Sequence, residues 1–183
     1  NATNFFLKGE KSLESTGLKP CVRENSLTLI ADPYKFKGLS GIDAGITRLF
    51  GVVSEVDYVA ILSWLEEREE IRELLEKISS QIQKFLKLPT TVNFGPRYLH
   101  STGQFHKGGL DGGIFIQIVA EVPNDLSIPD HEYSFRVLHR AQADADLAVL
   151  SDLGRRVVRI HLGVNSTRGL ADLNIAFDRA LSG

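Results

Sequence analysis

Short β-rich runs alternate with helical patterns from residue 26 onward, and this alternation is the feature that most limits the possible folds. The runs are 27–31 (LTLIA), 58–62 (YVAIL), 91–94, 114–120 (IFIQIVA) and 157–162 (VVRIHL). Strands that alternate with helices predict crossover connections and a mainly parallel sheet with both faces covered. The sequence therefore predicts an α/β three-layer sandwich in which helices flank a five-stranded sheet.

Four segments between or after these runs carry the spacing of amphipathic helices. The clearest is 71–86, where apolar residues recur every three or four positions and charged residues occupy the other face. A second helix is predicted over 134–153, with Ser134 as its N-cap and Gly154 as a left-handed stop. Two shorter helices are predicted over 41–50 and 168–181.

Residues 1–25 show no clear period, and we predict that they form an arm or a connector in front of one domain over 26–183. A chain of 183 residues is long enough for one such domain with a substantial core. The sequence begins at Asn1 and contains no methionine, which is typical of a piece excised from a longer polypeptide. We therefore expect a larger parent protein.

The net charge and the cysteine content argue against several classes of function. A formal net charge of -2 gives no reason to expect nucleic acid or an anionic membrane as a partner. No apolar run reaches the roughly 18 residues of a membrane span. The single cysteine, Cys21, cannot form an internal disulfide, so the fold does not need an oxidising compartment. We expect a cytoplasmic protein.

The segment 95–109 (GPRYLHSTGQFHKGG) holds more polar groups than a core segment can satisfy. It follows the predicted strand 91–94, and open α/β sheets bind ligands beyond the carboxyl ends of their strands. We therefore predict a ligand site here. His100 is the candidate for proton transfer near neutral pH. The candidates for binding an oxyanion such as phosphate are Arg97, Ser101, Thr102 and Lys107.

Each of these residues also has a purely structural interpretation. In that interpretation Arg97 pairs with a surface carboxylate, and Lys107 meets the negative end of a helix dipole. Ser101 or Thr102 then serves only as a helix N-cap, and Gln104 holds the loop by bonding to backbone. The residues by themselves leave both interpretations open.

Neither a metal ion nor an organic cofactor is expected. His100 and His106 are six residues apart, which is not the i,i+4 spacing of a zinc-binding helix. We predict instead that His106 is a solvent-facing helix residue. The glycine pairs at 108–109 and 112–113 precede a strand and do not open a helix, so they do not form a dinucleotide-binding fingerprint.

The run GPRYLHSTGQFHKGG, continued by DGGIFIQIVAEVP, resembles the end of bifunctional transaldolase/glucose-6-phosphate isomerase proteins. The resemblance extends through DYVAILSWL upstream and LHRAQADADLAVLSDLGRRVVRIHLG downstream, and covers roughly residues 26–163. Phosphoglucose isomerases in general share a histidine followed four residues later by glutamine, here His100 and Gln104. The resemblance implies a sugar-isomerase-like fold, with a parallel five-stranded sheet flanked by helices.

The resemblance also implies a reaction, the isomerisation of glucose 6-phosphate to fructose 6-phosphate, with a sugar phosphate as substrate. The histidine that matches His100 opens the sugar ring, and Gln104 belongs to the substrate site. The family's proton-shuttling glutamate and most of its phosphate loop belong to an upstream half, and a lysine near the family's last helix has no counterpart here. We therefore expect upstream isomerase and transaldolase domains as partners, a homodimer as a possible arrangement, and an inactive isolated fragment. The alternative is a non-catalytic phosphosugar-binding or dimerisation module.

Overall fold

The centre of the sheet consists of parallel strands, and two further strands extend it antiparallel at one side. The strands of the computed structural model, which describes residues 2–9, 11–109 and 111–182, are β1 (Lys19–Glu24), β2 (Leu27–Ala31), β3 (Tyr58–Ser63), β4 (Thr90–Phe94), β5 (Gly113–Val119) and β6 (Arg156–His161). Their order in the sheet is β1-β2-β6-β5-β3-β4. β3, β4, β5 and β6 pair in parallel, whereas β2 runs antiparallel to β6 and β1 antiparallel to β2.

The sheet has six strands, so the expected number of five is wrong; the additional strand is β1. β1 lies within 1–25, the segment interpreted as an arm, and it pairs with β2 from Lys19↔Ala31 to Glu24↔Leu27. Its residues are all exposed or half-buried, so no buried alternation marks the strand in the sequence. α1 (Ala2–Leu7) and a 3₁₀ turn, η1 (Glu14–Thr16), precede β1, and α1 contacts α5 (Phe135–Asp152).

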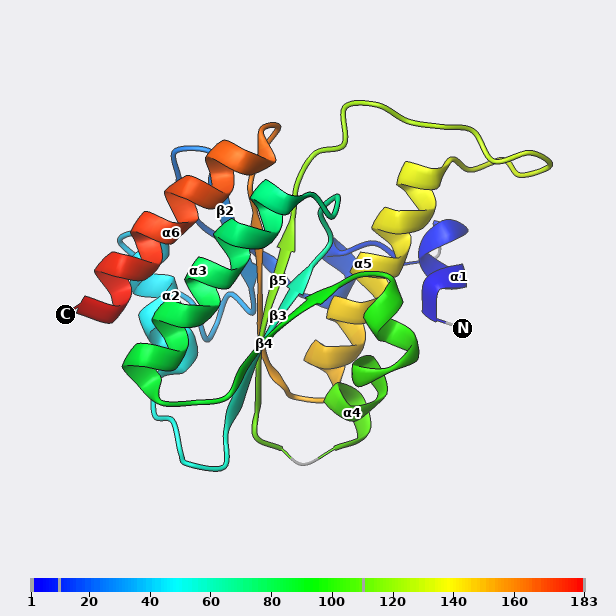
Figure 1. The fold of residues 1–183 in the computed structure, drawn as a ribbon. Helices are drawn as coiled ribbons and strands as arrows, with labels where there is room; N and C mark the ends of the chain where they lie inside the picture. Colours follow the sequence, from blue (N-terminus) through cyan, green and yellow to red (C-terminus); the bar gives the residue numbers. More distant parts are fainter. Residues whose placement is uncertain (1, 10, 110, 183) are drawn as a thin grey trace.

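Helices cover both faces of the sheet, which confirms the predicted three-layer α/β architecture (Figure 1). α2 (Ile42–Phe50), α3 (Glu69–Leu86) and α6 (Ser166–Ser182) lie on one face, and α1, α4 (Thr102–Gly108) and α5 lie on the other. Side chains of a strand alternate between faces, so Ile114, Ile116 and Ile118 enter the first core while Phe115 enters the second. Burying each such side chain is worth about 1.5–3 kcal/mol.

The helix signals found in the sequence are confirmed in the structure. Ser134 is the N-cap of α5, and its hydroxyl accepts a hydrogen bond from the Val137 N–H at 3.3 Å. Gly154 follows α5 with a φ of 72°, a conformation that glycine adopts without steric cost. α3 ends at Leu86, where Lys87 takes the left-handed conformation. None of the helices within the described ranges is long and apolar enough to cross a membrane.

The carboxyl ends of β3, β4, β5 and β6 lie along one edge of the sheet, because these strands are parallel. β3 leads into α3 on one face, whereas its neighbour β5 leads into α5 on the opposite face. The loops that follow β3 and β5 therefore separate between two adjacent strands. Open α/β sheets bind their ligands at such a point.

Candidate functional site

The predicted site segment follows β4 as a 3₁₀ turn, η2 (Arg97–His100), and then α4. Tyr98 anchors it: the side chain is buried, and its hydroxyl donates a hydrogen bond to Asp146 Oδ2 at 2.6 Å. The same hydroxyl accepts a hydrogen bond from Trp64 Nε1 at 3.0 Å. Burial and the neighbouring Asp146 carboxylate raise the pKa of Tyr98 well above its usual range, so the phenol stays protonated and can donate.

The polar side chains around this anchor point outward. His100, Ser101, Thr102 and Gln104 are all exposed. Thr102 Oγ1 donates to Asn93 Oδ1 at 3.2 Å, and Gln104 Nε2 donates to the Leu99 carbonyl at 3.2 Å. The backbone bond of Gln104 is the one its structural interpretation predicts.

Both cations of the segment are paired with carboxylates. Arg97 donates to Glu67, and both side chains lie at the surface. The Lys107 ammonium lies 2.7 Å from Asp146 Oδ1, whose side chain is only 2 % exposed. The charge of Lys107 therefore compensates a buried carboxylate, and both cations already have a carboxylate partner.

His106 is buried, and the expectation that it faces solvent is wrong. The residue is 4 % exposed, and its ring packs among Tyr58, Tyr98, Phe105 and Phe115. Nδ1 lies 3.1 Å from the Tyr58 hydroxyl, and Nε2 is buried with no hydrogen-bond partner in the described part of the chain. Burial lowers the pKa of His106, an effect that the Asp146 carboxylate partly opposes, so the neutral ring is favoured.

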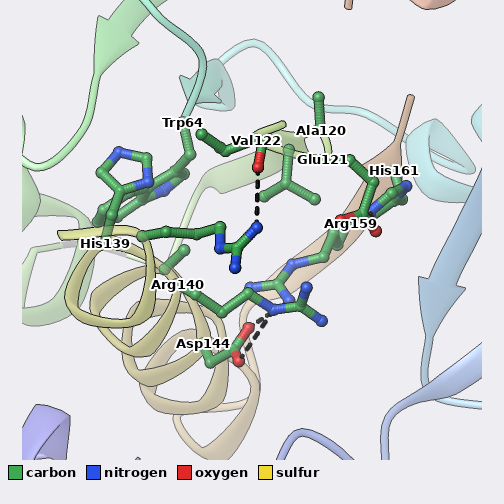
Figure 2. A pocket seen from close by; sticks show the side chains of 12 residues that line it. Trp64, Ala120, Glu121, Val122, His139, Arg140, Asp144, Arg159 and His161 are labelled. Carbon is green, nitrogen blue, oxygen red and sulfur yellow. Dashed lines mark hydrogen bonds and ion pairs between the residues drawn. The ribbon is translucent and has the colours of Figure 1, made fainter. Parts of the chain in front are cut away.

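A cavity opens at the same edge of the sheet, beyond the carboxyl ends of β3, β5 and β6 (Figure 2). His100 and the other candidate residues do not line it. Its lining residues are Trp64, Val119, Ala120, Glu121, Val122, Arg136, His139, Arg140, Ala143, Asp144, Arg159 and His161. The cavity thus gathers three arginines and two histidines at the point where the loops after β3 and β5 separate.

Arg159 is the central charged group of this cavity, and the sequence analysis did not single it out. Arg159 lies on β6 and the residue is 1 % exposed; Nε donates to Gln117 Oε1 at 2.6 Å and Nη1 to Asp144 Oδ1 at 2.5 Å. Gln117 and Arg159 are direct partners in the β5–β6 ladder, and Gln117 Nε2 donates to the Ala143 carbonyl at 2.9 Å. Two polar residues inside otherwise apolar strands were the available signal, since such residues need buried partners.

The two histidines of the cavity, His139 and His161, are half-buried, and burial lowers the pKa of both. The His139 ring lies edge-on to Trp64 with centroids 5.0 Å apart, and it bonds to the Gly95 backbone. His161 Nδ1 accepts the Gly163 N–H at 3.0 Å, and Nε2 lies 3.3 Å from Glu121. The Glu121 carboxylate partly offsets the effect of burial on the His161 pKa.

Comparison with known proteins identifies a fold but no family. No protein-family model matches the chain, and no curated protein matches it. A similar solved structure is that of the hypothetical protein TT0462 from Thermus thermophilus, with a TM-score of 0.64 and 15 % sequence identity. The alignment covers 98 % of this chain and 43 % of that one. This chain therefore spans less than half the length of that protein, and the two share a fold over that part.

Proposed function

We propose that the chain supplies one part of a phosphosugar isomerase site, and that His100 opens the ring of glucose 6-phosphate at a contact with another domain or subunit. The proposal rests on the motif around His100 and Gln104, which resembles that of bifunctional transaldolase/glucose-6-phosphate isomerase proteins. Ring opening needs a group that can donate a proton to the ring oxygen near neutral pH, and an imidazole can do so.

One observation carries the proposal furthest: His100 is exposed although the turn that holds it is anchored in the core. Tyr98, two residues earlier, is buried and bonds to both Asp146 and Trp64. The backbone of His100 is therefore held in place while its imidazole is exposed, as are the side chains of Ser101, Thr102 and Gln104. A catalytic group needs this kind of positioning when the rest of its site comes from a second body.

In this proposal, a second domain or subunit supplies the groups of the site that this chain lacks. Arg97 and Lys107 are already paired with carboxylates, so most of the phosphate binding has to come from elsewhere. The same holds for the carboxylate that moves a proton between C2 and C1 of the sugar. We assign both to the upstream isomerase half or to a second subunit, as the resemblance implies, and expect the isolated chain not to turn over sugar phosphate.

The test compares His100→Gln with His131→Gln in the full-length parent protein. His131 is an exposed histidine on the loop before α5 and serves as the control. Loss of a proton-transfer group predicts a fall in kcat of about 100-fold or more for His100→Gln. KM should change much less, and the control should keep its turnover. Unchanged turnover in His100→Gln would overturn the proposal and favour a phosphosugar-binding or dimerisation module. Robust turnover by the isolated chain would also contradict it.

A further inference from the structure

The cavity at the carboxyl ends of β3, β5 and β6 plays no part in the proposed role of His100. We infer that it is a separate site that binds the phosphoryl group of a small ligand, or phosphate itself, between Arg159 and Arg140 (Figure 2). Three observations support this inference: an unmet donor on a buried guanidinium, an exposed arginine that shares its carboxylate partner, and a matching size.

The unmet donor belongs to Arg159. This residue is 1 % exposed, and its Nε and Nη1 donate hydrogen bonds to Gln117 and Asp144. Its Nη2 is also buried, yet it has no acceptor among the residues that the structure describes. A guanidinium presents five N–H donors in a rigid plane, and a buried donor without an acceptor is costly. An oxyanion in the cavity would supply the acceptor.

The ion pairs around the cavity leave Arg140 as the cation best able to bind an anion. The cavity lining holds three arginines and two carboxylates, and Arg136 is paired with Asp125 at 3.2 Å. Asp144 is shared, because it lies 2.5 Å from Arg159 and 3.6 Å from Arg140. Glu121 lies against His161. Arg140 is the cation least fully compensated, and its side chain is 60 % exposed, so it can close on an anion from the solvent side.

The size of the cavity favours a phosphoryl group over a larger anionic ligand. It offers about 40 Å³ to the centre of a water-sized sphere. One water needs roughly 10–15 Å³ on that measure, so the space suits a group with a few oxygen atoms. Because the cavity is open to solvent, the remainder of a phosphorylated molecule can extend outward from it.

The position of the cavity adds a further argument. Trp64 directly follows β3, and Val119 and His161 are the last residues of β5 and β6. The chain leaves β3 toward one face of the sheet and β5 toward the other. Ligands of open α/β sheets bind in the crevice at this kind of divergence.

Trp64 makes the inference directly testable, because it is the single tryptophan of the chain and it lines the cavity. Inorganic phosphate is titrated into the chain at constant ionic strength while the Trp64 emission is recorded, with acetate as the comparison anion. We expect a saturable change with phosphate and none with acetate. Arg140→Gln, an exposed change that leaves the Arg159 network in place, should weaken phosphate binding at least about 10-fold.

Arg23→Gln is the matched control, since Arg23 is an exposed arginine of β1 outside the cavity lining. It should change the phosphate affinity by less than about twofold. No saturable change with phosphate, an equal response to acetate, or equal losses in the two variants would each overturn the inference. A simple phosphate ester then separates the two sources of ligand: tighter binding than phosphate assigns the site to esters, and equal binding assigns it to phosphate. The readout is binding without turnover, so its result is independent of His100.

Discussion

The Tyr98 hydroxyl donates a hydrogen bond to the Asp146 carboxylate at 2.6 Å, and both side chains are buried. Asp146 also receives the Lys107 ammonium at 2.7 Å, while Tyr98 accepts from Trp64 Nε1 at 3.0 Å. These contacts tie η2, α4 and α5 to the end of β3. A network of charge-assisted hydrogen bonds on the core side therefore holds the turn that carries His100, and each polar group in the network has a partner.

Tyr98→Phe should lower the free energy of unfolding by about 1–3 kcal/mol, because it removes a hydrogen-bond donor from a buried carboxylate. Urea unfolding at neutral pH measures the change. Tyr34→Phe is the control, since Tyr34 is 86 % exposed, and this variant should stay within about 0.5 kcal/mol of the parent. Equal stability of the two variants would show that the Tyr98–Asp146 bond contributes nothing net.

The stability of the fold should fall below about pH 6.5, because burial lowers the pKa of His106, His139 and His161. An unfolded histidine takes up its proton near pH 6.5, before the folded form does. Between the two pKa values the unfolded state therefore binds more protons, so the free energy of unfolding increases with pH there. The stabilisation by the neutral rings is complete above about pH 6.5 and is lost as pH falls toward the folded pKa values.

Removing one of these rings isolates its share of the pH dependence. His106→Gln should make the loss of stability between about pH 7.5 and 5.5 shallower than in the parent chain, measured by urea unfolding at each pH. His131 is exposed on a loop, so His131→Gln should leave the slope unchanged. An identical slope in all three proteins would contradict the assignment of a depressed pKa to His106.

The fold was predictable where the buried side chains of a strand or helix give the sequence a regular pattern of apolar residues. β2, β3, β5 and β6 carry compact apolar runs, β4 is rich in β-branched and aromatic residues, and α3 has a clear apolar face, so both kinds of element were found. β1 and α1 were missed. β1 lies at the edge without buried residues, and α1 is six residues long, too short for a period to show.

The candidate site was predictable in position but not in the direction of its side chains. The segment 95–109 lies at the carboxyl edge of the sheet as expected, yet His106 is buried and His100 is exposed. The change from a 3₁₀ turn to an α-helix inside the segment decides which residues face the core, and no simple period reports it. Gln117 and Arg159 meet only through the strand pairing, a long-range contact that one sequence does not reveal.

Arg159→Met should destabilise the chain by about 3–5 kcal/mol, because it leaves the buried Asp144 without its closest cation. Adding Asp144→Leu removes the uncompensated charge. The double variant should therefore regain part of the loss, with a coupling energy of about 0.5–3 kcal/mol in a double-mutant cycle. Asp152→Ala is the control second change, because Asp152 is exposed at the end of α5. If Asp152→Ala restores as much stability to Arg159→Met as Asp144→Leu does, the unpaired Asp144 carboxylate is not the cause of the destabilisation.

Gly95→Ala should disturb the contact between the His100 segment and the cavity, because the two meet at Trp64. A Cβ at position 95 would lie 2.7 Å from Cδ2 and Cε2 of the indole, closer than carbon atoms can pack. The indole cannot move freely, since Tyr98 and His139 pack edge-on against it with ring centroids 5.8 and 5.0 Å away. We expect a loss of about 1–3 kcal/mol in unfolding free energy and a shift of the Trp64 emission. Gly108→Ala places its Cβ in open space at the end of α4, and it should leave both quantities unchanged. Matching results for the two alanine variants would mean that the indole yields without cost and does not couple the two sites.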